Sequence, residues 1–159
     1  MTDHIHIDKA SADDCFSLAV MVGELLDEIM SATDTRAFNF DLEETTGRLK
    51  GFIEQGRYFV LVARDIGGID LGFVALYECY ALYAEGVFGT IPELYVRPEY
   101  RSQGIGRLLL DLAKAYGMEQ GWTRIEVTTP PLPQFARTLA FYEREGFAVS
   151  GGLKLRVLL

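Results

Sequence analysis

The spacing of apolar residues predicts a strand and two helices at the start of the chain. Residues 4–7 alternate polar and apolar side chains, the two-residue period of a half-buried strand. Apolar side chains then recur at helical spacing over residues 15–29, behind a capping pattern at residues 11–14. A second helix is predicted over residues 41–55, ended by Gly56. The chain is therefore expected to begin in the order strand, helix, helix.

β-Branched and aromatic residues then mark two strands, at residues 58–63 and 72–83, which are predicted to form an antiparallel hairpin with a turn at 65–68. A glycine-bearing loop at 85–89 is then predicted to lead into a strand at 90–96, and a helix follows between Gly104 and Gly121. The rest of the chain is predicted to contain a strand at 124–128, a rigid connector at 130–133 and a helix at 134–145. Two last strands are predicted at 147–150 and 153–158. The predicted order is βααβββαβαββ, an α/β pattern of about seven strands and about four helices.

Length and composition favour one domain over residues 1–159. The chain is 49% hydrophobic, which is ample for a core, and no apolar run approaches the roughly 20 residues that span a bilayer. The N-terminus lacks the pattern of a signal peptide, so we expect a soluble cytoplasmic protein without a membrane partner.

The distribution of charge and of metal-ligating residues argues against two kinds of binding site. The net charge of -8 lies in the N-terminal third, which argues against a nucleic-acid partner and weakly favours a cationic ligand. Cys15 and Cys79 lie far apart in apolar runs and are interpreted as buried reduced thiols. His4 and His6 have no third ligand nearby, so they are interpreted as surface residues and no metal site is predicted.

The segment between the strand at 90–96 and the next helix is a candidate anion site. It comprises Arg101, Ser102, Gln103, Gly104, Ile105, Gly106 and Arg107. Its glycines let the backbone approach a ligand, the helix start presents amides and a favourable dipole, and its arginines add positive charge. A pyrophosphate group is the expected ligand. Simple turn chemistry remains an equal alternative for the two glycines alone.

Two better-known phosphate loops are excluded. The P-loop requires a Gly-Lys-Ser/Thr ending, and the dinucleotide fingerprint requires a third glycine where Leu109 stands. Neither a nucleotide switch nor a nicotinamide enzyme is therefore supported.

The run from Glu93 to Gly106, ELYVRPEYRSQGIG, resembles the strand-four and pyrophosphate-loop motif of GNAT acetyltransferases, Gln/Arg-x-x-Gly-x-Gly/Ala. Residues 140–147, AFYEREGF, resemble the Phe-Tyr-x-x-x-Gly-Phe segment in the fourth helix of the same family. The resemblance implies a GNAT fold with a mixed, mostly antiparallel sheet. It also implies acetyl-CoA as co-substrate and direct attack by an amine acceptor.

The resemblance also assigns roles to residues. Glu93 is the candidate base, because a carboxylate there can accept a proton from an ammonium. Tyr142 is the candidate acid for the thiolate, and a main-chain amide of Tyr95 or Val96 is the candidate oxyanion donor, with Leu94 beside them. An ordinary strand carboxylate and a packed aromatic are the alternatives for Glu93 and Tyr142.

Other features leave alternatives open. The family often has Asn and Ala where this chain has Phe135 and Thr138, which motivates a second hypothesis, a non-catalytic acyl-CoA-binding regulatory module. The apolar tail from Leu153 to Leu159 fits an internal strand or the interface of a homodimer. Two groups of side chains suit an acceptor site but are better explained by packing and by helix-dipole compensation: Tyr77, Tyr80, Tyr83 and Phe88, and the acidic Asp41, Glu43 and Glu44.

Overall fold

The computed structural model describes residues 4–159, which form two compact units divided between Thr128 and Thr129. The expectation of one domain over the whole chain stays a prediction. Within the described residues, no helix is both long and apolar enough to cross a bilayer.

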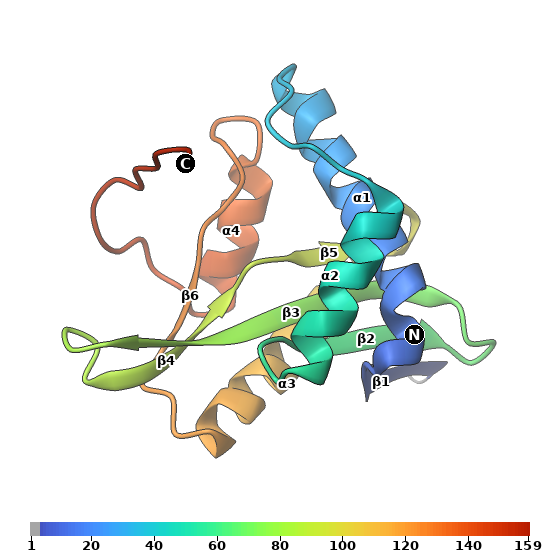
Figure 1. Ribbon diagram of the computed structural model, residues 1–159, viewed down its shortest axis with the longest axis horizontal. Helices are drawn as coiled ribbons and strands as arrows, with labels where there is room; N and C mark the ends of the chain where they lie inside the picture. Colours follow the sequence, from blue (N-terminus) through green and yellow to red (C-terminus); the bar gives the residue numbers. More distant parts are fainter. Residues whose placement is uncertain (1–3) are drawn as a thin grey trace. The chain divides into compact units, whose positions relative to one another are not determined.

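The first unit is built on a six-stranded sheet, whose strands lie one below another in Figure 1. Its strands run in the order β1-β2-β3-β4-β6, and β5 also pairs with β3. All pairs are antiparallel except β4 with β6, which is parallel. The strands are β1 (Ile5–Lys9), β2 (Phe59–Asp65), β3 (Asp70–Ala81), β4 (Gly86–Ile91), β5 (Leu94–Val96) and β6 (Ile125–Val127).

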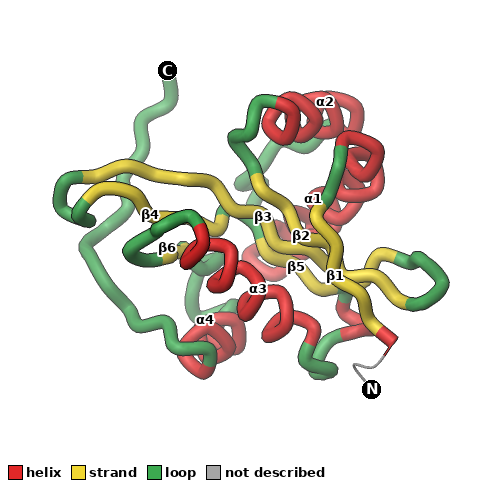
Figure 2. The backbone as a smooth tube through the Cα atoms, turned by 90° about the horizontal axis from the view of Figure 1, so that it is seen from below, coloured by secondary structure: helices red, strands yellow, loops and turns green. Residues whose placement is uncertain are grey.

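Helices cover both faces of this sheet. In Figure 2, α1 (Cys15–Thr33) and α2 (Leu42–Glu54) lie on one side of it and α3 (Ile105–Glu119) lies on the other. Two short 3-10 turns, η2 (Ala12–Asp14) and η3 (Pro98–Tyr100), precede α1 and follow β5. The α1–α2 face holds a core in which Leu18 and Met21 pack with Val60, Val62 and Phe73. Alternate residues of each strand face opposite sides of the sheet, and helices cover each side.

The predicted order of elements is confirmed for this unit, with two corrections. The loop predicted at residues 85–89 is wrong, because β4 already begins at Gly86 and pairs with β3 from there. The strand predicted at 90–96 is two strands, β4 and β5, separated by Pro92 and Glu93. Proline has no amide hydrogen for a strand ladder, which explains why pairing stops at this point.

The second unit contains α4 (Ala136–Arg144) and a long C-terminal segment. The strands predicted at 147–150 and 153–158 are wrong, because the structure has no strand there. Leu153, Leu155 and Val157 are 80–92% exposed. Their alternation is a strand pattern, but a strand also needs a partner for its backbone groups, and residues 4–159 supply none. Pairing of this tail across subunits stays a prediction.

Candidate active site

A β-bulge divides β4 from β5 and opens the sheet. Tyr77 pairs with Thr90, whereas Val74 pairs with Leu94, so β3 advances three residues while the opposite chain advances four. The extra residue is the hallmark of a bulge, which bends the strand that carries it. The parallel pairing of β6 ends at Ile91, and in the described part of the chain no strand pairs with the outer edge of β5. The sheet therefore splits where β4 ends.

The register decides which backbone amides face this opening. The carbonyl of Glu93 accepts from the amide of Ala75, and the amide of Arg97 donates to the carbonyl of Leu71, both at 2.9 Å. The backbone amides and carbonyls of alternate strand residues point the same way, so those of Tyr95 also point toward β3, where Tyr95 pairs with Phe73. The amides of Leu94 and Val96 consequently point toward the open edge. Of the two amides expected to donate to an oxyanion, that of Val96 has this orientation.

Glu93 lies in the bulge with its carboxylate half-buried. The hydroxyl of Tyr58 donates to it, at 3.4 Å from Oε1 and 3.3 Å from Oε2. Burial raises the pKa of Glu93 from 4.5 to about 7, while the hydrogen bond from Tyr58 acts in the opposite direction. A carboxyl group with this pKa holds and releases a proton near neutral pH, which is what a general base requires.

Aromatic rings surround this carboxylate on the α1–α2 face. The ring of Tyr58 stacks on that of Tyr77 with centroids 6.1 Å apart, and it packs against Phe52 of α2 at 5.0 Å. Beyond Tyr77, the thiol of Cys79 lies 3.1 Å from the hydroxyl of Thr90. The wall next to Glu93 is therefore aromatic and of low polarity, which accounts for its raised pKa.

The loop that the sequence marks as a candidate anion site has left-handed residues immediately before a helix. Ser102 and Gly104 both have left-handed conformations, with φ of 63° and 82°. Gly104 precedes α3, and its carbonyl accepts from the amide of Leu108. The amides of Ile105 and Gly106 therefore have no acceptor within the helix, and they lie at the positive end of its dipole. Gln103 completes the exposed turn.

The arginines near the loop bind carboxylates of α1. The guanidinium of Arg101 contacts both oxygens of Glu28, at 2.6 and 3.1 Å, and donates to the carbonyl of Val96 at 2.7 Å. Arg97 makes two hydrogen bonds of 3.0 Å to Glu24. These pairs fix the strand and loop against α1. The positive charge predicted for Arg101 is thus already partly neutralised, whereas Arg107 is exposed, 4.0 Å from Asp111.

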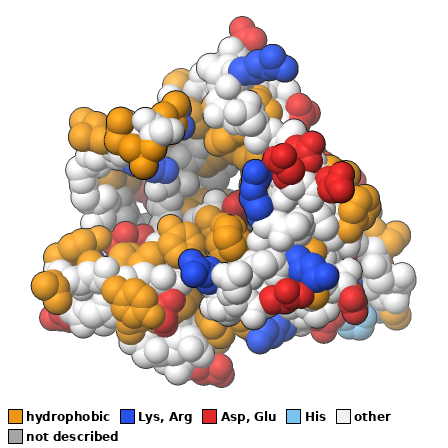
Figure 3. All heavy atoms as spheres, viewed as in Figure 1, with side chains coloured by type: hydrophobic (Ala, Val, Ile, Leu, Met, Phe, Trp, Pro, Cys, Tyr) orange, Lys and Arg blue, Asp and Glu red, His pale blue; other side chains and the backbone are white. Residues whose placement is uncertain are grey.

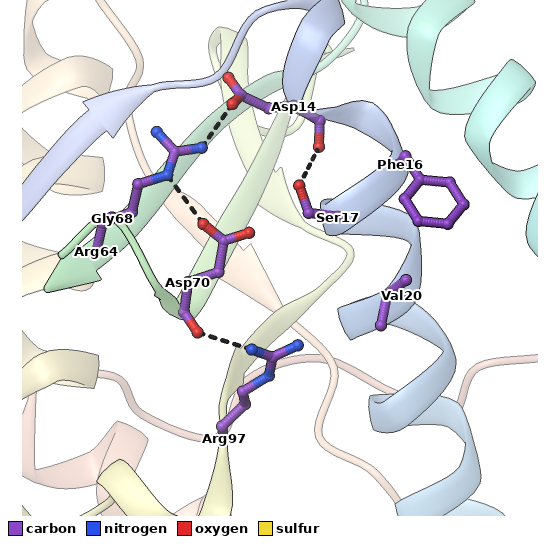
Figure 4. A pocket seen from close by; sticks show the side chains of 8 residues that line it. All are labelled: Asp14, Phe16, Ser17, Val20, Arg64, Gly68, Asp70 and Arg97. Carbon is purple, nitrogen blue, oxygen red and sulfur yellow. Dashed lines mark hydrogen bonds and ion pairs between the residues drawn. The ribbon is translucent and has the colours of Figure 1, made fainter.

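A cavity of about 410 Å³ lies between α1 and the β2–β3 turn (Figure 4), and Glu93 is not among the residues that line it. Its guanidinium groups are already held by the protein. Arg64 contacts Asp14 at 2.6 Å and Asp70 at 2.9 Å, and Arg97 donates to the carbonyl of Asp70 at 2.9 Å. This network ties the β2–β3 hairpin to η2 and to the end of β5, so the cavity is better explained by structure than by catalysis.

Tyr142 lies on α4 of the second unit. Its ring is 5% exposed and packs edge-on against Phe141 and Phe147, each with centroids 5.3 Å away. Burial raises the pKa of Tyr142 above its usual value of 10. The packing agrees with the alternative of a buried aromatic, and a role as proton donor stays a prediction.

Of the remaining sequence candidates, Tyr83 contacts Phe88, with ring centroids 6.4 Å apart. Tyr80 is 76% exposed and donates to Glu78, whereas Phe88 is buried. Figure 3 shows apolar side chains on the arm formed by β3 and β4, at its lower left. The side chain of Asp41 accepts from the amide of Glu44 and caps α2, and Glu43 and Glu44 lie in the first turn of this helix.

His4 and His6 are exposed, as predicted. Cys15 is buried and Cys79 is half-buried, and both are free thiols. Across residues 4–159, no three His, Cys, Asp or Glu side chains form a group suited to a metal ion.

Sequence reasoning missed Tyr58, Glu24 and Glu28. Tyr58 reaches Glu93 across 35 residues of sequence, and the two glutamates reach their arginines across 73. No local pattern marks such partners, because side-chain spacing reports only neighbours on the same element.

Comparison with known proteins agrees with this geometry. Residues 54–149, more than half of the chain, match the family model described as "Acetyltransferase (GNAT) domain". The uncharacterised N-acetyltransferase YhfO of Bacillus subtilis (strain 168) is 25% identical over 148 residues, which cover 93% of each chain.

Solved structures share the fold. An aminoglycoside acetyltransferase from an uncultured soil metagenomic sample superposes with a TM-score of 0.76 at 20% identity, covering 100% of this chain and 99% of that one. A predicted acetyltransferase with acetyl-CoA, from Clostridium acetobutylicum, gives 0.78 at 17% identity and 96% coverage of both chains. The split sheet, the loop before α3 and the family match lead to one conclusion: this chain belongs to the GNAT acetyltransferase family and is an acyltransferase.

Proposed function

We propose that this chain transfers an acetyl group from acetyl-CoA to a primary amine, with Glu93 as the general base. The observation that carries the proposal is a half-buried carboxylate with a pKa of about 7, placed in the bulge where β5 presents an open edge. Its pKa is near neutral pH, and general-base catalysis at a given pH is most effective when the pKa of the base lies near that pH.

The backbone of the loop before α3 supports acetyl-CoA as the acetyl donor. The amides of Ile105 and Gly106 suit a pyrophosphate, and left-handed Ser102 and Gly104 shape the loop before them. The Clostridium acetobutylicum structure of the same fold contains acetyl-CoA, which supports this assignment. Acetyl-CoA supplies a thioester, whose carbonyl carbon is the electrophile.

Each group of the chain then has one task. Glu93 accepts a proton from the acceptor nitrogen, directly or through water, as the nitrogen forms its bond to carbon. The amide of Val96 is oriented to donate a hydrogen bond to the carbonyl oxygen, which gains negative charge as the bond forms. The C–S bond of the thioester breaks as the carbonyl re-forms, CoA leaves as a thiolate, and Tyr142 stays the proposed proton donor to that thiolate. Its raised pKa limits the driving force for that transfer.

The acceptor is proposed only as a class, a primary amine of a small molecule or of a peptide or protein. Among the structures of the same fold, one acts on aminoglycosides, which supports the small-molecule choice. The aromatic wall of Tyr58 and Tyr77 beside Glu93 offers contact to an apolar body that carries the amine.

The test is release of CoA thiol from acetyl-CoA over a panel of primary amines. We expect amine-dependent release by the unaltered chain and a loss of about 100-fold or more in Glu93→Gln, because general-base catalysis contributes about 10²–10⁴-fold. Glu54→Gln, the same change at an exposed site on α2, is the matched control and should retain full activity. Full activity in Glu93→Gln would contradict its role as base.

The altered positions Phe135 and Thr138 favour one second candidate, a non-catalytic acyl-CoA-binding module. That alternative predicts calorimetric binding of acetyl-CoA without thiol release from any amine in the panel. Binding with release excludes it.

A further inference from the structure

The hydroxyl of Tyr58 lies across the carboxylate of Glu93, nearly equidistant from its two oxygens, at 3.4 and 3.3 Å. We propose that Tyr58 is a positioning residue that holds the Glu93 carboxylate through this hydroxyl and leaves its outer lone pairs open to the acceptor. The inference rests on the proposed function of Glu93 as base.

The hydroxyl of Tyr58 is held firmly enough for this task. Its ring lies parallel to that of Tyr77, with 7° between the planes, and packs on its neighbour Phe52. Its amide donates to the carbonyl of Phe52 at 3.1 Å, which anchors the backbone at the end of α2. A ring fixed by two aromatic neighbours and a backbone hydrogen bond has few other positions for its hydroxyl.

Tyr58 is a donor throughout the working pH range. Burial and the charge of Glu93 raise the pKa of Tyr58 above its usual value, so the phenol keeps its proton. One proton shared between two oxygens satisfies the inner side of the carboxylate. A carboxylate accepts at about four lone-pair positions, so positions remain for a proton from the acceptor.

The hydrogen bond also opposes the effect of burial. Burial favours the neutral acid, and a donor to the carboxylate favours the anion. Of the titratable groups that face Glu93, Tyr58 comes from the segment before β2 and Tyr77 from β3, while α2 contributes the apolar ring of Phe52. In Tyr58→Phe, burial would act without the opposing hydrogen bond, and the carboxyl group would hold its proton at neutral pH.

The experiment is a pH titration of the carboxyl carbons in protein labelled with ¹³C-glutamate. The resonance that is missing in Glu93→Gln identifies Glu93. We expect a midpoint at about 7 in the unaltered chain and about one pH unit higher in Tyr58→Phe. Tyr77→Phe is the matched control, because it removes a hydroxyl from the adjacent ring and leaves both contacts between Tyr58 and Glu93. Its midpoint should stay close to that of the unaltered chain.

The rate should follow the same shift. With an accepted amine, the acid limb of the kcat/KM profile should move up by about one pH unit in Tyr58→Phe. The value of kcat/KM should then fall about tenfold at pH 6 and be regained at pH 9. A merely structural role would lower activity equally at every pH. An unchanged carboxyl midpoint in Tyr58→Phe overturns the inference, whereas full activity of Glu93→Gln overturns the proposed function instead.

Discussion

The indole ring of Trp122 occupies a space that two glycines leave open. A Cβ added at Gly89 of β4 would collide with the ring, and one added at Gly117 of α3 would lie 2.8 Å from it. The indole nitrogen donates to Glu78 at 2.8 Å, and the ring meets Tyr116 edge-on. The tryptophan thus locks α3 to the part of the sheet that precedes the bulge.

Gly89→Ala should therefore destabilise the protein by about 1–3 kcal/mol, because the added methyl group overpacks the ring. Gly47→Ala is the matched control: Gly47 lies inside α2 with nothing within 4 Å of an added Cβ. It should stabilise the protein by about 0.5–1 kcal/mol through helix propensity. Urea unfolding followed by the fluorescence of Trp122, the only tryptophan, measures both. Equal effects of the two substitutions would contradict this packing.

At the scale of elements, hydrogen bonds and ion pairs to α1 fix the positions of β5 and of the loop before α3. Glu24 contacts Arg97 and the hydroxyl of Tyr95, and Glu28 contacts Arg101. α1 therefore sets the position of the open strand edge as well as that of the loop. The acidic excess of the N-terminal segment, interpreted from composition as a weak preference for cations, includes carboxylates that bind the chain's own arginines.

The start of α3 supplies a test that isolates charge from shape. Asn and Asp have nearly the same size, and both tolerate the left-handed backbone of Gly104. If a pyrophosphate binds here, Gly104→Asp should weaken acetyl-CoA about tenfold or more relative to Gly104→Asn, because only the first places a negative charge beside it. Calorimetric titration of both variants compares the two affinities. Equal affinities would place the phosphates elsewhere.

At the scale of the whole molecule, burial of the Glu93 carboxylate lowers the free energy of unfolding as the pH rises above about 4.5. The unfolded chain releases the proton of Glu93 near pH 4.5, and the folded chain holds it to about pH 7. Between these values the unfolded state binds fewer protons, so the free energy of unfolding falls as pH rises. At about 1.4 kcal/mol per pH unit, the full cost above pH 7 is about 3 kcal/mol.

Glu93→Gln should therefore raise the free energy of unfolding by up to about 3 kcal/mol at pH 8, and its advantage should shrink steadily toward pH 5. The amide still accepts from Tyr58, so packing changes little. Urea unfolding at both pH values measures the difference, with Glu54→Gln as the control. A pH-independent difference would mean that the carboxyl group is not buried in its charged form.

Local patterns in the sequence were sufficient for the order of helices and strands up to α4, apart from the division of β4 from β5 and the start of β4, and they also marked the loop before α3. Strand and helix periodicities report which residues share a face, and Gly104 lies where a helix begins after a strand. The same reasoning placed strands in the tail, because the alternation of Leu153, Leu155 and Val157 carries no information on whether a partner strand is present.

The sequence by itself determined the order of elements, the loop before α3 and the candidacy of Glu93, because these depend on residue type and on neighbours along the chain. Tertiary structure decided the bulge at Glu93, the amides that face its opening, the pairing of Arg101 with Glu28 and the contact of Tyr58 with Glu93. Each joins segments distant in sequence. Their meeting depends on strand register and helix packing over the whole sheet, which no local spacing encodes.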